Sequence, residues 1–241
     1  MNREYSLSAV ICAVDETFML EQTFQKLDGY GGAEEYLFVL AKTCTPGCLA
    51  TVERLCARSD CRWVYQTGEG LGNAIRESFF MVNGTHLVIW SADEATDVSS
   101  FPEMLRLSKE NPEKIIKISR WLRKDGFEGY GYVKKCLNYV SQRFFGLLFH
   151  SKLTEFTNPT QICPVAVYRG IRWNCTGFDF LPEMTFKPLK LGIEFIEVPT
   201  KNVPRLEGRS HHTLLSHIRY YRTVMKIFFT RKQDLIKETS D

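Results

Sequence analysis

Apolar residues in the first ninety positions fall into short continuous runs separated by segments with helical spacing. Continuous runs are typical of strands buried on both faces of a parallel sheet, and four are present: Leu7–Val14, Tyr36–Leu40, Arg62–Gln66 and His86–Trp90. The intervening patterns predict helices over Thr17–Leu27, Pro46–Arg58 and Asn73–Val82. Three consecutive strand–helix units predict a doubly wound α/β sheet, in which ligands bind beyond the carboxyl ends of the strands.

The second half of the chain has a less regular pattern. Ile115–Ile118 predicts a further strand and Val133–Phe149 a helix, with a loop over 119–132 between them. Leu181–Leu191 reads as another helix and Ile193–Pro199 as a closing strand. A length of 241 residues favours one large α/β domain with a short appendage over two domains.

The last part of the chain combines an apolar stripe with positive charge. From Leu214 on, apolar residues recur at 214, 218, 221, 225 and 228, which predicts an amphipathic helix. Nine Lys and Arg against Glu207 and Asp234 give 201–237 a net charge of +7, whereas the remainder carries −4. We expect this helix to lie on an anionic membrane surface, and the alternative is that it packs on the protein's own body or in a homodimer.

Composition excludes several classes of protein. No apolar run approaches the ~18 residues of a membrane span, and the N-terminus does not resemble a signal peptide. The eight cysteines lack the paired spacing of zinc modules, so we expect reduced thiols in a cytoplasmic protein, peripheral on the cytoplasmic face of a membrane. A slightly acidic body argues against a nucleic-acid partner.

Two turns at predicted strand ends carry candidate chemistry. Gly68–Gly72 opens a helix that contains Arg76, and free backbone amides with a guanidinium suit a phosphate. Asp93, Glu94 and Asp97 follow the fourth strand, where carboxylates can hold Mg²⁺ or Mn²⁺ against a diphosphate. The alternative for these acids is a solvated loop that caps a helix.

The order of short motifs resembles the family 2 glycosyltransferases, in particular the branch of dolichol- or polyprenol-phosphate sugar synthases. The likeness runs over about residues 6–212, so we expect a GT-A domain over 1–212 and a basic helical tail over 213–241. The motifs that carry it are Cys12-Ala-Val-Asp-Glu16, Gly70-Leu-Gly-Asn-Ala-Ile-Arg76, Ser91-Ala-Asp93, Ile118-Ser-Arg-Trp121, Asn158-Pro-Thr160, Gly177-Phe-Asp-Phe180, Glu197-Val-Pro199 and Arg205-Leu-Glu-Gly-Arg-Ser210.

The resemblance implies an inverting transfer of a sugar from a nucleotide diphosphate donor. The residues it assigns to the donor are Cys12, Ala13, Asp15, Glu16, Gly72, Arg76, Ala92 and Asp93. Asp93 and Asp97 would hold Mg²⁺ or Mn²⁺. An acceptor that is a lipid phosphate would be bound by Arg120, Arg205 and Arg209. A saccharide hydroxyl acceptor, as in polysaccharide or glycolipid synthesis, would need a base, for which Asp179 is the candidate. Asp93, Asp179 and Arg205 are thus the expected catalytic residues.

Several positions depart from the family pattern. Leu40 and Ala41 stand where the family has two aspartates, Ser91 replaces the first metal-motif aspartate, and His211 replaces a lysine. These departures motivate a second hypothesis, a non-catalytic member that binds a nucleotide sugar. A related nucleotidyl-transfer enzyme is a third, but the Gly-rich loop after the first strand that such enzymes have is absent.

Overall fold

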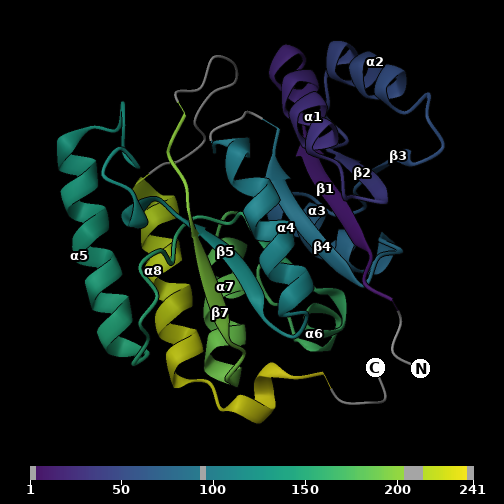
Figure 1. Ribbon diagram of the computed structural model, residues 1–241. Coiled ribbons are helices and arrows are strands. Elements are labelled where there is room, and N and C mark those ends of the chain that lie inside the picture. Colours follow the sequence, from purple (N-terminus) through teal and green to yellow (C-terminus); the bar gives the residue numbers. More distant parts are fainter. Residues whose placement is uncertain (1–3, 93–95, 204–213, 238–241) are drawn as a thin grey trace.

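A seven-stranded sheet runs through the centre of the protein (Figure 1). The computed structural model describes residues 4–92, 96–203 and 214–237. The strands follow the order β3-β2-β1-β4-β6-β5-β7, and only β6 runs antiparallel to its neighbours. Their bounds are β1 Leu7–Ala13, β2 Glu35–Leu40, β3 Cys61–Tyr65, β4 His86–Ser91, β5 Ile115–Ser119, β6 Gln161–Pro164 and β7 Phe195–Pro199. The predicted α/β class with a mostly parallel sheet is confirmed.

Helices cover both faces of this sheet and add a third layer at one end. Their bounds are α1 Phe18–Tyr30, α2 Pro46–Leu55, α3 Leu71–Met81, α4 Phe101–Glu110, α5 Tyr132–Leu148, α6 Val165–Gly170, α7 Phe180–Leu191 and α8 Leu214–Phe229. Side chains of α1, α2 and α4 form one apolar core, and side chains of α3, α6 and α7 form the other. The continuous apolar strands are therefore buried on both sides, as their sequences predict.

Three elements lie outside the sequence predictions. α4, β6 and α6 carry no predicted counterpart. β6 has four residues and α6 six, too short for a periodic pattern, whereas α4 has ten residues and is long enough to have been predicted. Other elements differ at their ends. The second helix ends at Leu55 rather than at Arg58, and the last strand begins at Phe195 rather than at Ile193.

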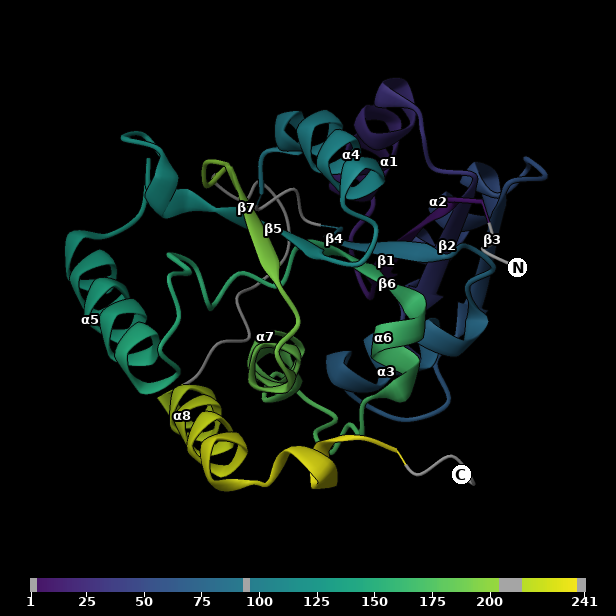
Figure 2. The same cartoon turned by 60° about the horizontal axis from the view of Figure 1, so that its bottom comes forward.

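A third apolar cluster joins α7, which lies under the sheet, to α5 and α8 at one end of the molecule (Figure 2). Phe145 of α5 and Phe186 of α7 pack there against Val224 and Ile227 of α8. The predicted C-terminal helix is thus present. Its buried face is centred on Val224 and Ile227 rather than on the predicted stripe, of which Ile218 and Tyr221 are exposed. No helix within the described ranges has both the length and the apolar content to cross a membrane.

Candidate functional site

The carboxyl ends of β1 and β4 lie side by side at one edge of the sheet. Cys12 is paired with Ser91 across the two strands, so Ala13 to Glu16 emerge next to Ala92. Glu16 folds back on this turn, because its Oε2 accepts hydrogen bonds from the amides of Val14 at 2.9 Å and Asp15 at 3.3 Å. The donor-binding residues expected from both strands therefore share one edge of the sheet.

Leu40, which stands where the resembled family has its first aspartate, is part of the core. Leu40 ends β2, is fully buried and pairs with Ala13 of β1. Its neighbour Ala41 donates its amide to the Ala13 carbonyl at 3.2 Å. An apolar residue at 40 thus packs at the sheet edge, in contact with the turn that begins the candidate site.

The glycine turn before α3 packs on the segment that precedes α7. The Asn73 amide donates to the Thr176 carbonyl at 3.1 Å, so this amide is engaged within the protein rather than free for a phosphate. A Cβ at Gly72 would lie 2.5 Å from the Phe180 Cβ and 2.7 Å from the Thr176 carbonyl carbon. Only glycine fits at position 72, because any side chain would collide with this segment. The close contact places the turn beside Asp179.

Asp179 precedes the first turn of α7. Its Oδ1 accepts a hydrogen bond from the Gly177 amide at 3.2 Å, which fixes the turn before the helix. Arg76, one turn into α3, donates to the Asn73 side-chain oxygen. Two expected site residues, Gly72 and Asp179, therefore belong to one packed unit, and Arg76 is tied to the same turn through Asn73.

Segments after β4, β5 and β7 meet at the other half of the same edge. Thr96 forms a bridge with Asn202, and the Asp97 amide donates to the Lys201 carbonyl at 3.3 Å. The Asn202 amide donates to the Gly126 carbonyl in the loop after β5. The end of the acidic loop, Thr96 and Asp97, thus lies against the segment that follows β7. Asp93, Arg205 and Arg209 themselves lie outside the described residues.

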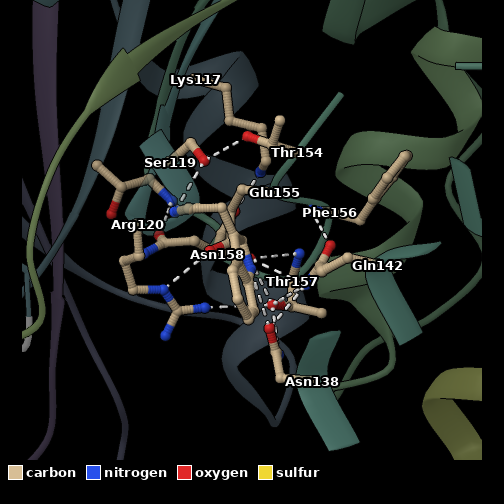
Figure 3. A network of polar contacts seen from close by, with 12 residues as sticks. Lys117, Ser119, Arg120, Asn138, Gln142, Thr154, Glu155, Phe156, Thr157 and Asn158 are labelled. Carbon is tan, nitrogen blue, oxygen red and sulfur yellow. Dashed lines mark hydrogen bonds and ion pairs between the residues drawn. The ribbon is translucent and has the colours of Figure 1, made fainter. Parts of the chain in front are cut away.

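Arg120, expected at the acceptor site, is held by a buried ion pair (Figure 3). Its Nε donates to Glu155 Oε2 at 2.8 Å, and its guanidinium lies over the Phe127 ring at 4.9 Å. Although burial disfavours the charge, Glu155 raises the pKa of Arg120 above its usual range. Arg120 is therefore a fixed, permanently charged cation, and its contacts with Glu155 and Thr157 orient it.

Glu155 is the centre of a polar network that sequence reasoning missed. Its Oε1 accepts hydrogen bonds from Gln142, the Thr157 hydroxyl and the Thr157 amide. Burial opposes its charge, but the nearby Arg120 lowers the pKa of Glu155, which stays ionised. Lys117 extends the network: it is fully buried in β5 and donates to Asn158 and Gln161.

One signal in the sequence points to this network. Lys117 interrupts the apolar run of β5, and a charged residue inside a buried strand requires polar partners. Burial lowers the pKa of Lys117 to about 8. Two of its partners, Asn158 and Gln161, lie next to β5 because β6 pairs with it, and a third, Thr185, comes from α7. The sequence does not reveal that pairing.

Among the residues that the structure describes, no three His, Cys, Asp or Glu side chains gather closely enough to hold a metal ion. Asp97 is the described member of the expected metal pair, and its Oδ1 accepts the Ser99 amide at 3.0 Å as the cap of a short 3₁₀ helix. All eight cysteines are free thiols. Burial raises the pKa of Cys12 to about 12, so this thiol at the β1 end stays protonated.

No protein-family model and no curated protein matches the sequence. Solved structures of glucosyl-3-phosphoglycerate synthase from Mycobacterium tuberculosis resemble the fold. The complex with Mn²⁺, uridine diphosphate and phosphoglyceric acid is 12% identical with a TM-score of 0.68, over 94% of this chain and 80% of that one. The complex with Mg²⁺ and uridine diphosphate is 14% identical with a TM-score of 0.67, over 98% and 81%. At such identity the likeness concerns the fold alone, which is an α/β fold of the GT-A type.

Proposed function

We propose that the protein transfers a sugar from a nucleoside diphosphate donor with inversion at the anomeric carbon. The observation that carries the proposal is the convergence of the segments after β1, β4, β5 and β7 at one edge of a GT-A sheet, where parallel sheets bind ligands. An acceptor oxygen forms a bond to the anomeric carbon while the bond to the diphosphate oxygen breaks, and the nucleoside diphosphate leaves.

The donor would lie across Cys12–Glu16 and Ala92–Asp93, with Gly72 and Arg76 on the neighbouring turn. Structures with the same fold support this, since their complexes contain uridine diphosphate or UDP-glucose together with Mn²⁺ or Mg²⁺. A divalent cation would neutralise charge on the leaving diphosphate. Two carboxylates would hold this cation: that of Asp97, which lies within the described residues, and that of Asp93, which does not. No step of the proposal depends on a metal.

For the acceptor we favour a lipid phosphate. Such an acceptor is already ionised and needs a cation rather than a base, and Arg120 is a permanent cation at the β5 end. Arg205 and Arg209 would complete the set, and the basic segment 213–241 would hold the 1–212 domain at a membrane surface. A saccharide hydroxyl is the alternative, with Asp179 as the base. A phosphorylated small acid is a third acceptor class, because neighbours were crystallised with phosphoglyceric acid.

Isothermal titration calorimetry with uridine and guanosine diphosphates and their sugars, with and without Mn²⁺, tests the donor site. We expect binding of one nucleotide, weakened in Asp93→Ala. Absence of binding for every nucleotide in the presence of metal would contradict the proposal. Release of nucleoside diphosphate on adding a polyprenyl phosphate then separates an active enzyme from a non-catalytic binding protein, since the latter binds the donor without turnover.

A further inference from the structure

Helix α5 presents an apolar stripe to the outside of the molecule. Val133, Leu137, Val140, Phe144 and Leu147 are spaced by four and three residues, which places them along one side of the helix. Their exposed fractions range from 44% to 78%. The helix buries only Gln142 and Phe145 among its residues. Within the part of the chain that the structure describes, nothing covers the stripe, and solvation of so many large apolar side chains is unfavourable.

Helix α8 continues this surface. The two helices lie side by side in both views (Figures 1 and 2), and the Ser141 hydroxyl of α5 is hydrogen-bonded to the Tyr221 hydroxyl of α8. Ile218, Tyr221 and Phe229 of α8 are exposed. We call the combined surface the α5–α8 face; its exposed apolar residues are Tyr132, Val133, Leu137, Tyr139, Val140, Phe144, Leu147, Ile218, Tyr221 and Phe229.

The charge around the α5–α8 face has a single sign. The sequence has no Asp or Glu over 129–154 and none over 208–233. Five exposed cations lie on the two helices and form no ion pair with a described carboxylate: Lys134, Arg143, Arg219, Arg222 and Lys226. An apolar face bordered by cations that pair with no described carboxylate, with tyrosines among the apolar residues, suits the headgroup boundary of an anionic bilayer.

A cavity of about 300 Å³ opens where both helices end. Phe149 and Phe228 are among its apolar walls, while Lys190 and Lys232 line it with positive charge. Lys190 donates to the Ile227 and Phe228 carbonyls at the end of α8, so its ammonium is fixed in place. None of the described residues that line this cavity is acidic. A phosphate attached to an acyl chain would find cations and apolar contacts together there.

We propose that the α5–α8 face binds the surface of a bilayer containing anionic lipids, with the α5 stripe at the boundary between headgroups and acyl chains. A second copy of the chain is a less suitable occupant, because two like faces would oppose cations to cations. The proposal deepens the proposed membrane association by assigning the apolar contact to α5, which the sequence pattern of the C-terminal helix did not indicate. It does not require that sugar transfer occurs.

Vesicle co-sedimentation of the full chain without nucleotide tests the proposal. Vesicles of phosphatidylcholine alone are compared with vesicles that also contain phosphatidylglycerol. We expect binding to the anionic vesicles only, reduced by high salt. The variant Leu137→Glu/Val140→Glu should lower the partition coefficient by about tenfold or more, because it replaces apolar contacts with charges that the leaflet repels. Tyr30→Glu, at an exposed apolar residue at the end of α1, should bind as the unmodified chain does.

Three outcomes would overturn the proposal. The first is that the α5 double variant binds anionic vesicles as well as the unmodified chain does. The second is that the unmodified chain binds both kinds of vesicle equally. The third is that sedimentation velocity shows a dimer for the unmodified chain and a monomer for the double variant, while neither protein binds vesicles. The melting temperature shows whether the variant folds, and Leu137→Ser/Val140→Ser serves if it does not. Nucleotide binding, measured on the same variants, should be unchanged. A failure of the donor site would therefore be visible separately from a failure of the membrane face.

Discussion

Glu155 and Arg120 form an ion pair that is almost closed to solvent, with Nε 2.8 Å from Oε2 and side-chain exposures of 0% and 11%. The pair links the end of β5 to the segment before β6 and holds the guanidinium at the sheet edge. Because the carboxylate also accepts hydrogen bonds from Gln142 and Thr157, the position of Arg120 depends on the whole segment. A cation fixed in this way is arranged before any ligand arrives.

Removal of the Glu155 charge should destabilise the fold strongly. Glu155→Gln keeps the size of the side chain but leaves a buried guanidinium without its counter-charge, which costs about 3–5 kcal/mol. Asp125→Asn is the matched control, since Asp125 pairs with Arg123 at exposures of 45% and 39%, and because solvent screens such a pair the loss should be far smaller. Urea unfolding monitored by circular dichroism measures both. Equal losses in the two variants would show that the buried pair contributes little.

Lys117 should make the unfolding free energy depend on pH. Burial lowers its pKa from 10.5 to about 8, so between these values the unfolded chain holds a proton that the folded chain has released. Stability attributable to Lys117 therefore rises with pH across this window, by up to about 3 kcal/mol.

Lys117→Met is the reference for that measurement because it keeps the length of the buried chain without a titrating group. The difference in unfolding free energy between the two proteins, followed from pH 7 to pH 10 in urea, should increase in favour of Lys117. Other titrating groups cancel in the difference. A difference that stays constant with pH would mean that the pKa of Lys117 is not lowered in the folded state.

Gly72→Ala should lower stability through a steric clash. The added Cβ would approach both Phe180 and the Thr176 backbone within 2.7 Å, and relief requires movement of the segment before α7. Overpacking of this kind costs about 1–3 kcal/mol. Gly170→Ala is the control, since its added Cβ meets no described atom within 4 Å apart from its chain neighbours and its own helix backbone, and it should be neutral or slightly stabilising. Differential scanning calorimetry measures the melting temperatures of both variants. A normal melting temperature for Gly72→Ala would rule out this close packing.

The sequence predicted the first half of the fold well for a physical reason. Each of β1, β2 and β4 is buried on both faces, so apolar residues fill consecutive positions and the strands stand out from the helices between them. Prediction failed at β6, where four residues pair with β4 and β5 across the centre of the sheet. Such a pairing depends on contacts distant in the chain and leaves no periodic pattern.

The candidate site also has a part that the sequence predicts and a part that it does not. The placement of Ala13 and Ala92 at one edge was predictable, because the carboxyl ends of parallel strands share that edge. The partners of Arg120 were not, since Glu155 is 35 positions away and reaches it through the chain that leads into β6. The sequence predicted an apolar stripe on the C-terminal helix, and the structure adds a second one: of the described apolar residues of the α5–α8 face, seven lie on α5 and three on α8. A helical pattern shows that an apolar side exists but not whether the protein covers it.

Asp179→Asn separates the two main acceptor classes. The asparagine keeps an oxygen that can accept the Gly177 amide, so the turn before α7 and the melting temperature should be nearly unchanged. If the acceptor is a saccharide hydroxyl, the lost carboxylate removes the base, and turnover should fall by about 10²–10⁴-fold. If the acceptor is a lipid phosphate, no proton has to be removed and turnover should change by less than about tenfold. Glu103→Gln, at an exposed acid of α4, controls for the loss of one negative charge. Steady-state assays with a polyprenyl phosphate and with a saccharide acceptor decide between the two acceptor classes. A large loss of turnover with the lipid phosphate would contradict the favoured acceptor mechanism.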